Sequence, residues 1–454
     1  MKEVDIDQVI ADLPNLSLLH PTARSGPFSG CQYKVEWNGR WSTHRAGEDL
    51  DLAGVTRDDV ELSCELGTLT LSKPVVTRHE FPSGEVEGST VAVHLDAECP
   101  AGDVPLTFRT YVRVEPTSWG HVLFPDSIEY TGSRGGGARA LLPLKAETFD
   151  LDVYWLREGP YLIFESTRGG LTLDSFRRLS GAARQLFSYL TGERCDRDSC
   201  DLVLAGGRLV EAWWYQGRTN EDSLYHPIPV TLSEAYLAAG SPKGRSIPPP
   251  LEPSAVARCL ACVLEQPALV APIEYLLHFA NLPVELRGAF LSIALESLTA
   301  HLQRQGLVDA PAAIGADAWA ALRVRLKHAL QEESEKWNVT DREKLKLVEA
   351  RLDNLNSPTN QDKLLRAFKA LGIALTPEEE TAIARRNIYL HRGRLLAPED
   401  VSSNPESWRG AYDVEMKIYT AVNRLLLKYL GYAGPVIDWG KTSTGGGEMA
   451  FTTI

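Results

Sequence analysis

A proline-rich stretch divides this chain into two parts of different character. Residues 238–254 read AAGSPKGRSIPPPLEPS, and successive prolines cannot continue a helix or a strand. Before this stretch, short runs rich in β-branched and aromatic residues alternate with turn residues, as in LTFRTYVRVEP and FDLDVYWLREG. After it, nearly every segment has helical periodicity. The pattern predicts an α+β multidomain chain.

The expected division follows from these changes in composition. A β-rich domain occupies residues 1–240, a linker residues 241–254, and an all-α bundle residues 255–435. Residues 436–454 are rich in Gly, Ser and Thr, which is typical of a flexible tail. We expect one helix within the β-rich part, ending at Gly192, because apolar residues recur there every three or four positions: Phe176, Leu179, Ala183, Leu186 and Leu190.

Charge and cysteine usage limit the class of protein. The 454 residues carry a formal net charge of −13, so nucleic acid could be bound only through a local basic patch. No apolar run approaches the roughly 18 residues of a membrane span, and the acidic start differs from a signal peptide. Seven scattered cysteines do not resemble a disulfide framework. We therefore expect a cytoplasmic protein with free thiols, with no membrane partner.

The helix expected after residue 375 begins and ends with clear signals. Thr376 suits the N-cap, Pro377 the first helical position, and Glu379 the third position of a capping box. Gly393 is expected to end the helix at about His391 or Arg392. Its last turns hold the densest polar chemistry of the chain: Arg385, Arg386, Asn387, Tyr389, His391, Arg392 and, just beyond, Arg394.

The spacing within this helix constrains any site that uses it. His391 lies in the last turn, where the macrodipole favours a protonated imidazole. Asn387 is four residues earlier and shares its face, whereas Arg386 is five residues earlier, about 140° around an ideal helix. A site using both Arg386 and His391 would need Arg386 to swing around the helix, a distorted last turn, or the same helix from a second subunit.

Two other helices show apolar faces. In residues 285–306 the expected buried stripe consists of Leu286, Phe290, Ile293, Leu298 and Leu302. In residues 411–431 the expected apolar face consists of Val414, Ile418, Val422, Leu425 and Tyr429, and Gly431 ends that helix.

These residues resemble those of a known superfamily. Arg386-Asn387 followed by His391, an R-N-x-x-x-H arrangement late in a helical domain, is similar to the ribonuclease motif of the HEPN superfamily. Glu296 in LSIALESL resembles the acidic residue of an early HEPN helix, and residues 350–373 resemble the segment that leads to the motif. A β-rich part followed by such a domain is most similar to the ApeA-type anti-phage defence proteins.

The resemblance implies an endoribonuclease that needs neither metal nor cofactor. In such enzymes the RNA 2′-OH attacks the adjacent phosphorus and leaves a 2′,3′-cyclic phosphate. His391 would transfer protons, Arg386 would stabilise phosphate charge, and Asn387 would orient His391 or a phosphate oxygen. Further residues are expected to bind RNA or to support the site: Arg385, Arg392 and Arg394 for binding, Glu296 and Tyr389 for support. The resemblance also implies a homodimer or higher homo-oligomer through the helical domain and, for a defence protein, a phage-derived trigger.

Several alternatives stay open at this point. Arg and His near a helix C-terminus also occur merely to satisfy free carbonyls, and Glu296 could be an ordinary surface glutamate. The domain could be a non-catalytic HEPN-type adaptor or a nucleotide-binding dimerisation protein. The β-rich domain could be a sensor, a substrate-positioning surface or a scaffold. Four residues could form a zinc site, although free cysteine also packs as a small apolar residue: Cys195, Cys200, Cys259 and Cys262.

Overall fold

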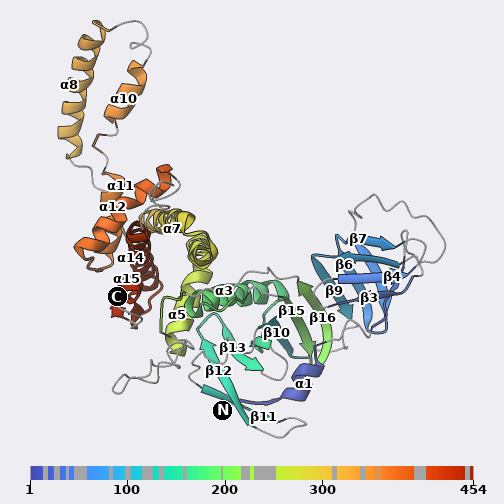
Figure 1. Ribbon diagram of the computed structural model, residues 1–454. Helices are drawn as coiled ribbons and strands as arrows, with labels where there is room; N and C mark the ends of the chain where they lie inside the picture. The colour runs from blue at the N-terminus through green and yellow to red at the C-terminus, as the bar shows by residue number, and fades with distance from the viewer. Residues whose placement is uncertain are drawn as a thin grey trace. The chain divides into compact units, whose positions relative to one another are not determined.

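The computed structural model divides the chain into two compact units (Figure 1). Unit 1 comprises Met1–Asn281 and Leu430–Ile437, and unit 2 comprises Leu282–Tyr429 and Asp438–Ile454. The structure describes residues 2–13, 19–24, 31–36, 40–44, 59–80, 85–97, 104–114, 126–131, 137–156, 161–195, 198–215, 225–229, 252–308, 314–337, 344–353, 355–356, 358–392, 405–444 and 450–452.

The described strands of unit 1 confirm the β-rich first part of an α+β chain. Twelve of them form one sheet, which is antiparallel except where β1 pairs with β11. Their order is β1 (Lys2–Asp5), β11 (Asp126–Thr131), β12 (Gly137–Lys145), β13 (Asp150–Leu156), β14 (Tyr161–Ser166), β10 (Leu106–Arg113), β15 (Ser199–Ala205), β16 (Arg208–Tyr215), β9 (Ala92–Ala97), β6 (Gly67–Ser72), β5 (Val60–Cys64) and β2 (Thr22–Ala23).

A second sheet contributes to the same core. Its order is β3 (Tyr33–Val35), β4 (Arg40–His44), β8 (Glu85–Ser89) and β7 (Val75–Glu80). Tyr33, Trp41 and Val86 from this sheet belong to one buried cluster with Leu69 and Leu95 of the large sheet. A Cβ at Gly88 would collide with the Trp41 ring, so close packing of that ring against β8 requires glycine there.

Helix α3 (Leu173–Thr191) is the predicted helix within the β-rich part. Thr172 and Ser175 form its capping box, and Gly192 ends it with a φ of 79°. All five residues of the predicted apolar face are buried. Phe176 packs on Phe108 of β10 with 5.4 Å between ring centroids, and Figure 1 shows the helix beside this part of the sheet.

The helices that follow the predicted linker also belong to unit 1. They are α5 (Pro253–Glu265), η2 (Pro267–Leu269), α6 (Val270–His278) and η3 (Phe279–Asn281). Both α5 and α6 pack on α3. The contacts therefore divide the chain after Asn281, whereas composition suggested residues 241–254. The difference arises because α5 and α6 bury their apolar sides in unit 1, which a change in periodicity does not reveal.

A buried ionic network holds the N-terminal helix α1 (Ile6–Ala11) to the large sheet. Arg109 of β10 donates from Nη1 to Asp12 at 2.5 Å and from Nε to Glu165 at 2.6 Å. Tyr154 donates to the same Glu165 oxygen at 3.0 Å, and the Tyr111 hydroxyl donates to the Val9 carbonyl at 2.8 Å. Each buried charge thus has an opposite charge or a hydrogen bond, as burial requires.

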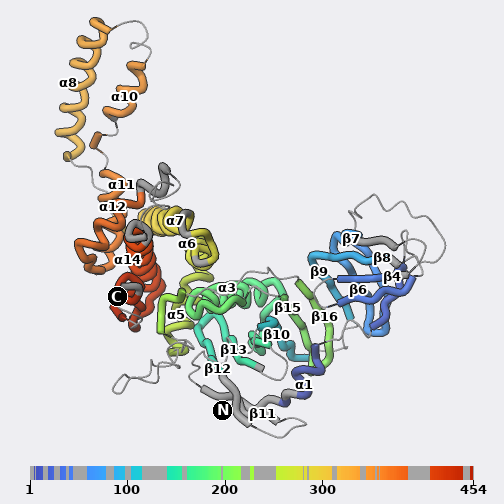
Figure 2. The backbone as a smooth tube through the Cα atoms, in the orientation of Figure 1, coloured from blue at the N-terminus to red at the C-terminus, as the bar shows by residue number. Residues whose placement is uncertain are grey.

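Unit 2 is helical, as predicted for the second part of the chain. Its described elements are α7 (Val284–Arg304), α8 (Ala316–Ser334), α10 (Leu345–Asp353), α11 (Asn360–Ala370), α12 (Pro377–Arg392), α14 (Pro405–Tyr429), α15 (Trp439–Thr444) and β18 (Phe451–Thr452). Helix α7 packs against α11, α12 and α14, and α12 also packs against α14 (Figure 2). Helices α8 and α10 pack against each other.

The predicted stripe on α7 was partly wrong. Leu286 and Ile293 are 44% and 36% exposed, whereas the buried face carries Leu291, Leu295, Leu298 and Leu302. The reason is that α11, α12 and α14 cover a face rotated from the one that apolar residues alone suggested. On α14 the prediction was better, because four of its five predicted residues are buried: Val414, Ile418, Val422 and Leu425.

The tail expected to be flexible contains ordered elements. Strand β17 (Val436–Ile437) is fully buried within unit 1, where the Ile437 N–H donates to the Pro227 carbonyl at 2.8 Å. Helix α15 lies in unit 2, where the Trp439 N–H donates to Thr420 Oγ1 of α14 at 3.0 Å. Apolar side chains and these backbone bonds outweigh the Gly and Ser content.

No single helix within the described ranges has both the length and the hydropathy of a membrane span. Residues Pro253–Glu265 and Pro267–His278 reach such a composition only as a pair, which is bent by 104°.

Candidate active site

The start of α12 is fixed by the predicted capping box. The Thr376 N–H donates to Glu379 Oε2 at 2.8 Å, and the Glu379 N–H donates to Thr376 Oγ1 at 3.2 Å. The helix ends at Arg392, as its sequence signals predicted. Its backbone is helical throughout, so positions 386 and 391 stay about 140° apart around the axis.

An ion pair with α14 fixes how α12 is rotated. Arg424 of α14 donates from Nη1 to Glu379 Oε1 at 3.0 Å and from Nη2 to the Ala374 carbonyl at 2.8 Å. Both charged side chains are at least nine-tenths buried. Glu379 therefore caps α12 and binds α14 at once, which determines the face of α12 that meets α7.

That face carries Arg386, and α7 presents Glu296 to it. Arg386 Nη1 donates to Glu296 Oε1 at 2.5 Å, although 90 positions separate the two residues. The Arg386 side chain is 2% exposed, whereas the Glu296 side chain is 41% exposed. The cation of the pair is therefore buried, whereas the carboxylate is partly exposed to solvent.

Burial explains the electrostatics of Arg386. Ala382 and Ile383, one turn earlier on α12, are buried, as is Leu295 on α7. Burial lowers the pKa of Arg386 from its ordinary value, and the Glu296 carboxylate opposes part of this change. An arginine nevertheless stays protonated in proteins, so the site contains a fixed positive charge.

The remaining predicted site residues are described to different extents. Arg385 is exposed on α12, and no ion pair joins it to the described part of the chain. For Asn387, Tyr389, His391 and Arg392 the helical backbone is described and the side chains lie outside the description. Arg394 lies wholly outside the described residues. The structure thus brings together Glu296 and Arg386, two of the predicted set.

Two polar contacts of unit 2 were missed by sequence reasoning. One is the pairing of Arg424 with Glu379, which an arginine within the apolar face of α14 could have suggested. The other joins His301 of α7 to the Tyr429 hydroxyl of α14, with Nε2 and the oxygen 3.2 Å apart. Burial, and secondarily the charge of Arg304, lower the pKa of His301. Both contacts fix helices around the Arg386 pair.

The described cysteines of unit 1 are not gathered into a cluster of potential metal ligands. Six described cysteines are free, and Cys195, Cys200 and Cys259 are buried. Burial raises the pKa of the Cys259 thiol to about 12 and that of Cys200 well above its ordinary value. The described residues contain no group of three or more His, Cys, Asp or Glu suited to a metal ion.

The adjacent tryptophans of β16 lie on opposite faces of the sheet. Trp214 is 1% exposed in the core, and Trp213 is partly exposed on the face that α3 covers. His94 of β9 stacks on Trp213 with centroids 3.9 Å apart, and the Arg177 guanidinium lies 4.5 Å from its ring centroid. Asp201 of β15 pairs with Arg177 of α3, so one strand and one helix of unit 1 supply the groups that lie against the Trp213 ring.

Comparison with known proteins gave no match. No family model, no curated protein and no solved structure is significantly similar to this chain. The pairing of Glu296 with Arg386 is therefore the geometric basis for any functional conclusion.

Proposed function

We propose that unit 2 is an RNA-cleaving domain similar to the HEPN ribonucleases. The supporting observation is that Arg386 of the R-N-x-x-x-H segment binds Glu296, the acidic residue that the resemblance associates with the site. These two residues lie on separate helices and 90 positions apart in the sequence, so a chance pairing between them is not expected. The proposed site comprises Arg386, Asn387 and His391, with Glu296 and Tyr389 in support.

The proposed reaction is an internal transesterification of RNA. The 2′-oxygen forms a bond to the adjacent phosphorus while the bond from phosphorus to the 5′-oxygen breaks. The 2′-OH loses its proton to a base or to water, and protonated His391 donates a proton to the departing 5′-oxygen. The products are a 2′,3′-cyclic phosphate and a 5′-OH end. Positive charge from Arg386 stabilises the pentacoordinate phosphate, and Arg385, Arg392 and Arg394 bind flanking phosphates.

The proposal extends to assembly and biological role. Two α12 helices facing each other in a homodimer would bring Arg386 of one copy near His391 of the other, which removes the 140° separation within one helix. Unit 1 would then sense a phage-derived trigger or position RNA. The protein would act in anti-phage defence in the cytoplasm.

A second candidate function is favoured by the burial of Arg386. A guanidinium that is 2% exposed and already bound to a carboxylate can hold a phosphate only after its surroundings rearrange. An adaptor or nucleotide-binding dimerisation domain would need no such rearrangement, and the pair would then serve only to hold α7 against α12.

One experiment separates these candidates. Purified full-length protein is incubated with total cellular RNA, with and without EDTA, and the cut ends are mapped together with their terminal groups. Three proteins are compared: wild type, His391→Ala and His328→Ala. His328 is an exposed histidine of α8, so its variant controls for the loss of a histidine as such.

The proposal expects cuts with 2′,3′-cyclic phosphate ends in EDTA from wild type and His328→Ala, and cleavage reduced by at least about a hundredfold from His391→Ala. Equal cleavage by wild type and His391→Ala would show that the activity belongs to another site or a contaminant. Absence of cleavage in all three proteins, with specific retention of a nucleotide, would support the adaptor.

A further inference from the structure

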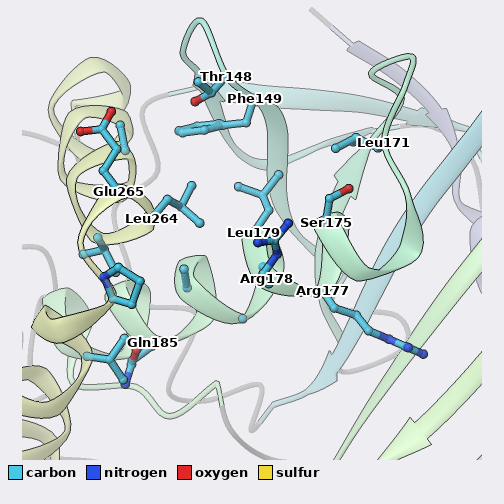
Figure 3. Close-up of a pocket in the computed structure, with 16 residues that line it drawn as sticks. Thr148, Phe149, Leu171, Ser175, Arg177, Arg178, Leu179, Gln185, Leu264 and Glu265 are labelled. Carbon is cyan, nitrogen blue, oxygen red and sulfur yellow. The ribbon is translucent and has the colours of Figure 1, made fainter.

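A cavity of about 630 Å³ lies within unit 1 between α3 and α5 (Figure 3). Its volume lies in the range of roughly 300–1,000 Å³ that is usual for sites binding small molecules. Most of its lining is apolar and comes from the β12–β13 turn, from α3 and from the α5–α6 junction, including Phe149, Leu171, Leu179, Leu264, Pro267 and Val270. Such a lining suits a hydrocarbon or aromatic group.

Small residues on α3 and α5 leave the space of this cavity unfilled. Gly181 lies inside α3, where a Cβ would meet no atom within 4 Å, and its φ is not positive. Glycine inside a helix is less stable than alanine, and here neither a close contact nor the backbone conformation requires it. Ala182 of α3 and Ala261 of α5 also line the space. Larger side chains at these positions would fill the cavity.

The charges at the rim are arranged unequally. Arg177 points away from the cavity toward Trp213 and Asp201, whereas Arg178 lies beside Leu179 (Figure 3). Arg178 is exposed and forms no ion pair with the described part of the chain. Glu265 lies on the other side, at the end of α5 (Figure 3). Glu265 is the last residue of α5, where the helix dipole adds to the negative charge on that side.

We propose that this cavity binds an amphiphile with one carboxylate and an acyl chain of medium length. The carboxylate pairs with the Arg178 guanidinium, whose planar fork suits two carboxylate oxygens. The chain lies along Leu179, Leu264 and Val270, and Glu265 with the α5 terminus disfavours the reverse orientation. The site is independent of the RNA-cleaving site proposed for unit 2.

The test is calorimetric titration of the full-length protein with three probes that share a ten-carbon chain. Sodium decanoate carries the carboxylate, decanol carries no charge, and decyltrimethylammonium carries the opposite charge; all are used below their aggregation limits. Two variants alter the site: Arg178→Gln removes the charge, and Gly181→Leu fills the cavity. Their matched controls are Arg208→Gln, at the exposed first residue of β16, and Gly181→Ala.

One decanoate per chain should bind to the wild type and to both controls. Arg178→Gln should weaken decanoate at least tenfold, the loss expected for a charge-assisted pair, and leave decanol unchanged. Gly181→Leu should weaken decanoate and decanol alike, also at least tenfold. If circular dichroism shows that Gly181→Leu does not fold, Ala182→Phe is used instead to fill the cavity from the neighbouring position.

Four results would overturn the proposal, three from the titrations and one from light scattering. The first is absence of decanoate binding to the wild type, and the second is equal binding by the filled variants. The third is tighter binding of decyltrimethylammonium than of decanoate, which would assign the site to cations through Glu265. Light scattering accompanies each titration: if Gly181→Leu separates a dimer into monomers, the cavity holds a second copy of the chain instead.

Discussion

Arg386 donates a hydrogen bond to Glu296 at 2.5 Å while remaining almost wholly buried, so α7 and α12 are joined by one charged contact among apolar residues. Removing one member of such a pair leaves the other in an unfavourable setting, whereas removing both need not. The contact can therefore be tested for stability and for activity separately.

A double-mutant cycle tests how much the ion pair between Arg386 and Glu296 contributes to the stability of the protein. Glu296→Ala should lower the free energy of unfolding by about 1–2 kcal/mol, less than for a fully buried pair because Glu296 is partly exposed. Arg386→Met combined with Glu296→Ala should cost less than the sum of the single changes. Urea unfolding of the four proteins measures these energies. Additive costs would mean that the two charges do not interact in solution.

The catalytic prediction concerns three residues of α12. His391→Ala should reduce cleavage by roughly 10²–10⁴, the usual range for loss of general acid–base catalysis. Arg386→Ala should reduce it strongly, and Asn387→Ala less, because Asn387 only orients a neighbouring group. Initial cleavage rates on a defined RNA check this order, with His328→Ala as the control. Undiminished rates for His391→Ala would rule out the proposed mechanism.

The assembly prediction is a homodimer through unit 2. Its basis is the 140° between positions 386 and 391 on one continuous helix. Mixing Arg386→Ala with His391→Ala should restore part of the activity, because one site of the mixed dimer contains both wild-type residues. Cleavage assays of the mixture and light scattering check this. A monomer fully active at nanomolar concentration would contradict it.

The pH prediction concerns His226 in unit 1. This histidine is buried, the Nδ1 to Ile228 carbonyl distance is 2.7 Å, and burial lowers its pKa to about 4. The unfolded chain binds the proton at its higher pKa of roughly 6.5, so the stabilisation is present above that pH and is lost as pH falls toward 4. The loss is of the order of 3 kcal/mol. Between pH 7 and pH 4, His226→Asn should lose less unfolding free energy than the wild type, as measured by urea unfolding. If the unfolding free energies of the two proteins fall in parallel with pH, the low pKa assigned to His226 is wrong.

Gly181 inside α3 and Gly192 just beyond its end should respond oppositely to replacement by alanine. Gly181→Ala should raise the free energy of unfolding by up to about 1 kcal/mol, because the helix interior favours alanine and the added methyl group meets no atom. Gly192→Ala should lower it by about 1 kcal/mol, because the φ of 79° at the helix end disfavours a side chain. Thermal unfolding measures both, and equal signs would contradict the helix geometry.

The sequence predicted local structure where the determining groups are close along the chain. The Thr376 capping box, the Gly192 helix end and the apolar face of α3 depend on neighbours within a few residues, and all were confirmed. Faces that depend on remote partners were predicted less well. Leu286 and Ile293 are exposed because the position of α12 and α14 on α7 is not encoded in the apolar pattern of α7 alone.

The candidate site shows the same limit. Sequence reasoning placed Glu296 near the motif only through a family resemblance, since nothing in the α7 pattern identifies a partner 90 positions later. It missed Arg424 because the partner of a buried arginine cannot be identified from its own helix. The roles given to Asn387, Tyr389, His391, Arg385, Arg392 and Arg394 stay predictions.

The separation of Glu296 and Arg386 in the sequence also determines when their ion pair can form during protein synthesis. A ribosome adds about 5–20 residues per second, so roughly 5–18 s pass between the incorporation of the two residues, given their separation of 90. Helix α14, which fixes the rotation of α12 through Arg424, is made later still. A nascent chain therefore has no complete pair until both helices are made, and any activity that depends on the pair begins only once α14 has left the ribosome.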